Sequence, residues 1–304
     1  MRNIIEIKNL KKHFKGVKAV DDVSFQVREG ELFAFLGLNG AGKSTTINII
    51  CSSLKKDSGQ VIIDGLNIDE YLDKVKPLIG VVFQQSHLDG RLSAYDNLRY
   101  RASLYGIPKK QFEERINYLS EKLKFNDYIR QPLNKLSGGQ RRRIDVARAL
   151  IHEPKILILD EPTTGLDPNT RILMWNLITE LRVKNKLTVL LTTHYMEEAS
   201  DANYVVILNK GNVVANGTPV KLKNQYTNDY IRIYDYDKNI IDEISRQGLQ
   251  SRVDGKILIV YVKNANEAVD FIVRNKSQLY DFEIIKGKMD NVFLNVTGAM
   301  MGEQ

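Results

Sequence analysis

The chain has 304 residues, a length typical of about two domains, and its 43% of hydrophobic residues excludes a disordered chain. The net charge of +7 is mild, and because acidic residues are interspersed with the basic ones we expect no nucleic-acid partner. The longest apolar run, 32–38, is far shorter than the ~20 residues of a membrane-spanning helix, and the N-terminus lacks a signal-peptide pattern. With Cys51 as its single cysteine the chain has no intrachain disulfide, so we expect a soluble protein of a reducing compartment.

The first thirty residues alternate apolar and polar side chains along 4–14 and 20–30, with turn residues between the two stretches. This alternation is typical of antiparallel strands with one buried face, which we expect to lie beside a larger sheet.

The region up to residue 220 alternates short apolar runs with helical patterns. The runs predict buried strands at 31–37, 77–84, 155–161, 186–194 and 204–211, and the patterns predict helices at 43–54, 110–123, 139–151 and 171–184. Strands that alternate with helices indicate an α/β fold with a mainly parallel sheet. We interpret the basic cluster 141–148 as a solvated helix face; a patch near phosphates or anionic lipid is the alternative.

The composition changes after Pro219. The polar stretch 221–229 is interpreted as a linker, and the patterns that follow it predict a βαββαβ order. This order indicates a small α+β domain with a ferredoxin-like arrangement.

A glycine-rich segment, Gly37–Ser44, fits the pattern G-x-x-x-x-G-K-[ST] between a predicted strand and a predicted helix. Glycines allow backbone N–H groups to surround phosphate oxygens, and the helix N-terminus adds partial positive charge. Lys43 is expected to reach the β- and γ-phosphates, Ser44 to bind Mg²⁺ and Thr45 to support the α-phosphate. The segment therefore predicts a binding site for a nucleoside triphosphate.

Two carboxylates, Asp160 and Glu161, end the apolar run that starts at Ile156. We expect the buried strand to place Asp160 near the phosphate loop, where it can hold the water shell of Mg²⁺. Glu161 is then the candidate general base that accepts a proton from the attacking water. A solvated acidic turn is the alternative interpretation.

The segment Leu136-Ser137-Gly138-Gly139-Gln140 predicts a second anion-binding helix start, far along the chain from the phosphate loop. With this segment between the two phosphate-site motifs, residues 3–220 resemble the nucleotide-binding subunits of ABC transporters. The resemblance implies a P-loop NTPase (ABC ATPase) core with antiparallel and helical subdomains in residues 1–222, and an accessory domain in 223–304. It also implies a head-to-tail dimer, in which ATP lies between the phosphate loop of one protomer and Ser137–Gln140 of the other.

The resemblance assigns the functional residues one by one. The implied catalytic residues are Glu161, His194 and Gln84. The implied ligands of Mg²⁺ are Ser44, Gln84 and Asp160. The implied ATP-binding residues are Phe14, Asn39, Gly40, Ala41, Gly42, Lys43, Ser44 and Thr45 in one protomer and Ser137, Gly138, Gly139 and Gln140 in the other.

Some of these assignments have alternatives. Phe14, matched to the aromatic that stacks on adenine, is otherwise a packed strand residue. The sequence has Phe83-Gln84-Gln85 where the family commonly has Pro-Gln, so Gln85 competes with Gln84. Asp167 resembles the residue that touches the partner protomer and also fits a helix N-cap followed by proline.

Two further residues are weighed in the same way. His194 is matched to the family's switch histidine, which binds the γ-phosphate; a structural histidine is the alternative. Cys51 is expected to be a small core residue rather than a reactive thiol.

The branch of the family is indicated by what accompanies the motifs. The chain has one phosphate loop and one copy of the segment Leu136–Gln140, called the signature segment below. This favours a transporter subunit that works with a separate membrane permease, on the cytoplasmic face of the membrane. The tail 290–298 resembles that of drug- and antibiotic-exporter ATPases, so we expect export of a drug-like, lipid or polymer substrate by a homodimer. An importer ATPase and a soluble remodelling ATPase are the alternatives.

The permease contact is expected between Gln84 and Ser137, where an exposed apolar groove can receive a cytoplasmic helix of the permease. The candidates for this groove or for the core of the helical subdomain are Leu88, Leu92, Tyr95, Leu98, Tyr100, Leu104 and Tyr105.

Overall fold

The computed structural model describes residues 2–237 and 239–298. Contacts between residues divide the chain into two compact units, Met1–Asn216 and Gly217–Gln304. The sequence analysis set the domain boundary between 222 and 223, and the end of its second domain, 299–304, lies outside the described residues. No helix in the described ranges is both long and apolar enough to cross a membrane.

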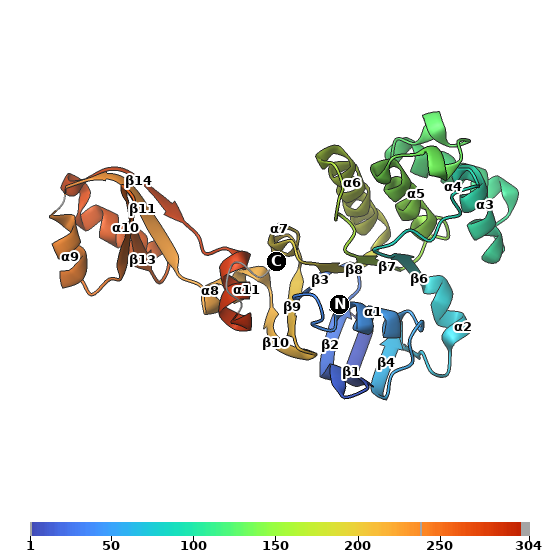
Figure 1. The fold of residues 1–304 in the computed structure, drawn as a ribbon, viewed down its shortest axis with the longest axis horizontal. Coiled ribbons are helices and arrows are strands. Elements are labelled where there is room, and N and C mark those ends of the chain that lie inside the picture. Colours follow the sequence, from blue (N-terminus) through green and yellow to red (C-terminus); the bar gives the residue numbers. More distant parts are fainter. Residues whose placement is uncertain (1, 238, 299–304) are drawn as a thin grey trace. The chain divides into compact units, whose positions relative to one another are not determined.

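A six-stranded sheet forms the centre of the first unit, in the order β10-β9-β3-β8-β7-β6 (Figure 1). Its strands are β3 (Leu32–Leu36), β6 (Ile79–Val82), β7 (Ile156–Asp160), β8 (Thr188–Thr193), β9 (Tyr204–Asn209) and β10 (Asn212–Gly217). The pairs β9–β3, β3–β8, β8–β7 and β7–β6 are parallel. Every residue of β3, β7 and β8 is buried, as expected for strands covered on both faces. The predicted α/β core is confirmed.

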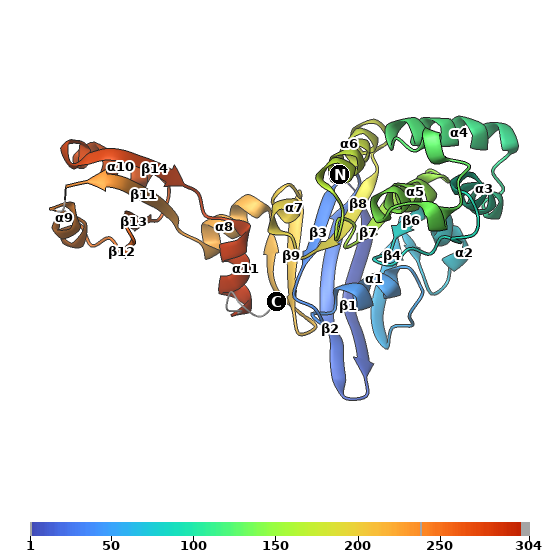
Figure 2. The same ribbon diagram turned by 45° about the horizontal axis from the view of Figure 1, so that its top comes forward.

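A second sheet of the first unit has the order β2-β1-β4-β5. Its strands are β1 (Asn3–Phe14), β2 (Val17–Arg28), β4 (Ser58–Ile63) and β5 (Leu66–Asn67), and every neighbouring pair is antiparallel, as the alternating pattern predicts. Helix α1 (Lys43–Ile50) contacts both β2 and β7 (Figure 2). A continuous apolar core contains buried residues of both sheets and of α1. Three rings, Phe25, Phe33 and Phe35, meet there with centroids 4.8–5.4 Å apart.

Six further elements complete the helical part of the first unit. They are α2 (Leu72–Val75), α3 (Ala94–Leu104), α4 (Lys109–Lys122), α5 (Gly138–Leu150), α6 (Pro168–Asn185) and α7 (Met196–Ser200), with 3₁₀ turns at Lys76–Leu78, Asn126–Tyr128 and Leu133–Lys135. Helices α3, α4 and α5 contact one another and form the helical subdomain (Figure 1). Helix α5 also lies on β6, so the helical subdomain is attached to the central sheet through α5.

The second unit contains an antiparallel sheet in the order β12-β13-β11-β14. Its elements are α8 (Pro219–Tyr226), β11 (Asp229–Tyr236), α9 (Ile240–Arg246), β12 (Ser251–Asp254), β13 (Ile257–Val262), α10 (Ala265–Arg274), a 3₁₀ turn (Lys276–Gln278), β14 (Leu279–Ile285) and α11 (Met289–Thr297). The succession β11-α9-β12-β13-α10-β14 has the βαββαβ order that the sequence predicts, as two interleaved split βαβ units.

The interpretation of 221–229 as a linker is wrong, because helix α8 occupies most of it. The Thr218 hydroxyl accepts a hydrogen bond from the backbone N–H of Lys221, and Pro219 follows it in the first turn, two features that start helices. Leu222 is fully buried, and α8 contacts α11. The polar composition of 221–229 did not indicate this helix, which is stabilised by α11, about 70 residues later in the chain.

Gly80 in β6 lies closely packed against the end of α5. A Cβ atom at this position would lie 2.1 Å from the carbonyl oxygen of Ala149 and 2.9 Å from the Pro154 ring. We expect Gly80→Ala to reduce the free energy of unfolding by about 1–3 kcal/mol, because the helix must move away from the strand. Urea denaturation followed by the fluorescence of Trp175, the only tryptophan in the chain, reports on this unit.

Gly90→Ala is the matched control, since a Cβ there meets no atom closer than 3.7 Å. Its unfolding free energy should stay within about 0.5 kcal/mol of the wild type. Equal midpoints for the wild type and both variants would show that the β6–α5 spacing is not constrained by Gly80.

Candidate functional site

The phosphate loop connects β3 to α1, and two of its glycines are required by close backbone approaches. Gly42 has a left-handed φ of 104°, and a Cβ on it would lie 2.3 Å from the carbonyl oxygen of Ala19. A Cβ on Gly37 would lie 2.8 Å from the carbonyl oxygen of Leu208. Only glycine allows the chain to turn here while packed against these two segments.

Lys43 is buried at the start of α1. Its ammonium group donates hydrogen bonds to the carbonyl oxygens of Gly37, at 2.7 Å, and Leu38, at 3.2 Å. Burial lowers the pKa of Lys43, and the nearby carboxylates of Glu161 and Asp160 act in the opposite direction. Within the part of the chain that the structure describes, the cation therefore lies inside its own loop and donates its hydrogen bonds to neutral oxygens alone.

The two carboxylates at the end of β7 are both connected to Thr192 of β8. The Thr192 hydroxyl donates to Asp160 Oδ1 at 2.5 Å and accepts from the backbone N–H of Glu161 at 3.1 Å. Glu161 has a left-handed φ of 45°, unusual for a residue with a side chain. This conformation follows directly after the buried strand, so the chain turns sharply at Glu161.

Gln84 and His194 approach the same Glu161 side chain. Gln84 Nε2 donates to Glu161 Oε2 at 3.0 Å, and His194 Nδ1 lies 3.8 Å from Glu161 Oε1. The three residues follow β6, β7 and β8, which are adjacent and parallel, so their side chains meet at one edge of the sheet. Of the two glutamines considered, the hydrogen bond to Glu161 comes from Gln84.

Ser137 and Gln140 begin helix α5 with a reciprocal cap. The Ser137 hydroxyl accepts from the backbone N–H of Gln140, and Gln140 Oε1 accepts from the backbone N–H of Ser137. A Cβ on Gly139 would lie 2.9 Å from Asp167 Oδ2, so the segment lies against the start of α6. Within the described chain no hydrogen bond or ion pair joins Ser137–Gln140 to the phosphate loop.

The other predicted residues occupy distinct positions. Phe14 ends β1 with 44% of its surface exposed, so it is not a packed strand residue; Lys12 Nζ lies 5.3 Å from its ring centroid. Asp167 caps α6 by accepting a hydrogen bond from Thr170 N, and Pro168 follows it, so the predicted N-cap is confirmed. Cys51 follows α1, half-buried against the apolar core, and burial raises its pKa to about 12.

The sequence analysis missed Arg142. The solvated-face interpretation of 141–148 is wrong for this residue, which is 7% exposed and donates to three backbone carbonyl oxygens. These belong to Phe83 at 2.5 Å, Pro162 at 2.9 Å and Glu161 at 3.3 Å. One signal was available: Arg142 lies one helical turn before the apolar residue Val146 and therefore shares its buried face.

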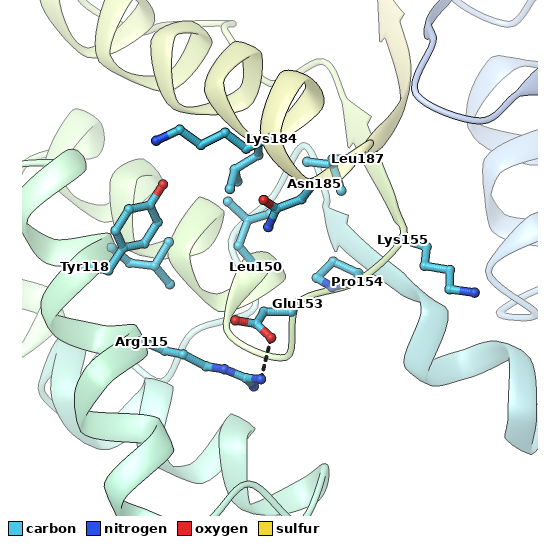
Figure 3. Close-up of a pocket in the computed structure, with 11 residues that line it drawn as sticks. Arg115, Tyr118, Leu150, Glu153, Pro154, Lys155, Lys184, Asn185 and Leu187 are labelled. Atoms are coloured by element: carbon cyan, nitrogen blue, oxygen red, sulfur yellow. Dashed lines mark hydrogen bonds and ion pairs between the residues drawn. The ribbon is translucent and has the colours of Figure 1, made fainter.

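A cavity of about 340 Å³ lies elsewhere in the first unit, between α4 and the end of α6 (Figure 3). The Arg115–Glu153 ion pair, 2.6 Å long, closes one side of it. Lys155 and Leu187 line it and immediately precede β7 and β8. At the opposite ends of these strands, Asp160 is the last residue of β7 and His194 follows β8. The cavity is therefore separate from the candidate site.

Comparison with known proteins supplies the family. A family model described as ABC transporter matches residues 20–164. The probable multidrug ABC transporter ATP-binding protein YbhF of Escherichia coli K12 is 38% identical over 226 residues, which are 74% of this chain and 39% of that protein. The Nod factor export ATP-binding protein I of Cupriavidus pinatubonensis is 33% identical over 301 residues, covering 98% of this chain and 92% of that protein.

A solved structure agrees with these relatives. It is the dimeric, post-hydrolysis state of an ATP-binding cassette bound to ADP and Pi, with a TM-score of 0.65 and 29% identity, over 71% of this chain and 98% of that chain. This chain belongs to the ATP-binding proteins of the ABC transporter family. The first unit is accordingly an ABC ATPase fold, and the activity of this class is hydrolysis of ATP.

The donor groups of this ABC ATPase fit a magnesium nucleotide. Ser44, Gln84 and Asp160 carry oxygen donors, the ligand type that Mg²⁺ prefers. Lys43 is buried with only carbonyl oxygens as direct partners, and a phosphate oxygen is a stronger acceptor for an ammonium group than a neutral carbonyl.

We expect Lys43→Ala to weaken ATP binding at least about tenfold, or ~1.4 kcal/mol, because the substitution removes the only full positive charge inside the loop. Calorimetric titration with ATP measures the loss. Lys76→Ala, which removes an exposed lysine, is the matched control and should leave the affinity unchanged. An unchanged affinity in Lys43→Ala would mean that the nucleotide binds elsewhere.

Proposed function

We propose that this ABC transporter subunit uses ATP binding to close a homodimer and ATP hydrolysis to reopen it, driving export through a separate membrane permease. The observation that carries this proposal is the meeting of Gln84, Glu161 and His194 at the sheet edge where the phosphate loop also lies. In this arrangement Glu161 offers a base, Gln84 a polar positioning group and His194 a phosphate-binding group at the same sheet edge.

The site residues are assigned roles on this geometry. The phosphates are bound by residues Asn39–Thr45, among them Lys43. The exposed ring of Phe14 stacks on adenine. Mg²⁺, held by Ser44, Gln84 and Asp160, would neutralise charge on the β- and γ-phosphates. Glu161 takes the proton of the attacking water, and His194 binds the γ-phosphate.

The dimer follows from the separation of Ser137–Gln140 from the phosphate loop. In the described chain no hydrogen bond or ion pair joins the N-terminus of α5 to that loop. The reciprocal cap uses the N–H groups of Ser137 and Gln140, so those of Gly138 and Gly139, together with the helix dipole, are the ones that suit an anion. We propose that the signature segment binds the γ-phosphate of ATP held by a second copy, with Asp167 beside it at the interface. The dimeric state of the structural relative supports this arrangement.

Export and membrane association are proposed from the names of the relatives, a multidrug transporter protein and a Nod factor exporter. The permease would bind on the cytoplasmic side of the membrane, at the helical subdomain. Leu98 is fully buried there, whereas Leu92, Tyr100 and Leu104 are between 41% and 66% exposed and are available to a permease helix. The second unit, which includes helix α8 and therefore begins at Gly217 rather than at the expected 223, is proposed as an accessory domain of the ATPase.

We expect Glu161→Gln to retain ATP binding while hydrolysis falls by about 10²–10⁴-fold, because the amide keeps the shape of the side chain and cannot accept the proton. The trapped ATP should hold the dimer closed. Gel filtration with ATP should show a dimer peak that ADP does not produce, and wild-type hydrolysis by this variant would contradict the role of Glu161.

A second prediction concerns the signature segment. Ser137→Arg should leave ATP binding to the monomer intact, because that site uses Phe14 and the phosphate loop. The rate of ATP hydrolysis should fall sharply, since a bulky cation blocks the helix N-terminus and cancels the favourable dipole. Loss of monomer ATP binding in this variant would argue against binding in trans.

Mixing Ser137→Arg with Lys43→Ala sharpens the test. In a mixed dimer one composite site carries both substitutions and the other carries neither. We expect mixing to restore ATPase activity that neither variant shows alone. Absence of rescue, with mixed dimers shown to form, would contradict independently active sites.

A further inference from the structure

We propose that Arg142 is a positioning residue for ATP hydrolysis, which holds the backbone around Gln84 and Glu161 so that the two side chains stay in contact. The inference rests on the proposed function, because it assumes that Glu161 is the base. It adds a residue outside the motifs that the sequence indicates.

The hydrogen bonds of Arg142 reach both segments that carry the pair. One guanidinium nitrogen donates to the carbonyl oxygen of Phe83, the residue before Gln84. The other two donate to the carbonyl oxygens of Pro162 and of Glu161 itself. Since a guanidinium group is planar and rigid, it fixes the distance between the two segments, and the Gln84–Glu161 hydrogen bond spans the same gap.

Two neighbouring charges keep α5 in register with the Gln84 segment. Asp145 follows Arg142 by three residues, and Arg148 follows Asp145 by three, so the three share one helix face. Arg148 donates to the carbonyl oxygen of Val81 at 2.9 Å and lies 3.8 Å from Asp145. Burial raises the pKa of Asp145, and the Ser86 hydroxyl and Arg148 oppose this effect.

The same helix begins at Ser137, one to two turns before Arg142. A displacement of the α5 N-terminus, such as engagement with ATP of a second copy, is therefore transmitted along a rigid helix to the backbone of Glu161. Arg142 thus links the signature segment to the base through backbone carbonyl groups.

Arg115 of α4 provides a matched control away from the site. Its guanidinium group donates to the carbonyl oxygen of Ile151 at 3.0 Å and to Glu153 at 2.6 Å, beside the separate cavity. Neither partner carries or neighbours Gln84, Glu161 or the proposed dimer interface. Arg142→Lys and Arg115→Lys thus make the same chemical change with and without contact to the proposed catalytic pair.

The test measures steady-state ATP hydrolysis by the full chain together with ATP affinity. A lysine cannot span three carbonyl groups, so we expect Arg142→Lys to lower kcat by about tenfold or more while the affinity for ATP stays within about twofold. Arg115→Lys should retain the wild-type kcat. Arg142→Gln is the second variant, should the lysine variant fail to fold, and its folding is followed by Trp175 fluorescence.

The Glu161→Gln background separates positioning from a general structural effect. If Arg142 acts through Glu161, adding Arg142→Lys to Glu161→Gln should change the residual rate by less than about twofold. An equal loss in both backgrounds, an unchanged kcat in Arg142→Lys, or a parallel loss in Arg115→Lys would overturn the inference. Wild-type hydrolysis by Glu161→Gln alone would instead overturn the proposed base.

Discussion

Parallel pairing of β3, β8, β7 and β6 is the constraint on which the candidate site depends. Because parallel strands all end at the same edge, residues distant in sequence are delivered to one place without any dedicated scaffold. The Thr192 hydroxyl then joins neighbouring strands by binding both Asp160 and the backbone of Glu161. Small shifts in strand register would separate these groups, so the buried apolar strands determine the geometry of the polar edge.

Two buried cations, Lys43 and Arg142, flank the carboxylates, and both are satisfied by backbone carbonyl oxygens. In the described chain neither forms an ion pair with Asp160 or Glu161. A carbonyl dipole compensates part of the cost of burying a cation and does not occupy a carboxylate. Asp160 and Glu161 therefore stay unpaired with these two cations. Asp160 accepts a hydrogen bond from Thr192 on Oδ1 and Glu161 accepts one from Gln84 on Oε2, so each carboxylate keeps a second oxygen for a metal ion or for water.

Local sequence patterns predicted much of this arrangement. The apolar run before Asp160 predicted a strand and the position of the acid at its end, and the glycine spacing predicted the phosphate loop. Arg142 was not predicted because its three partners lie 19 to 59 residues away in the sequence. They are backbone carbonyl oxygens, which every residue has, so no residue type marks them. Helix α8 escaped because its stability depends on α11, a partner that composition alone does not reveal.

Cys51, the one thiol in the chain, directly follows helix α1, which begins at the phosphate loop. With its pKa raised to about 12, it carries almost no thiolate at neutral pH, and thiolate is the form that reacts with alkylating labels. The native thiol is therefore expected to react more slowly with such labels than a cysteine on the surface. A single cysteine introduced on the exposed surface of the helical subdomain should accordingly take up a fluorophore or spin label before Cys51 does.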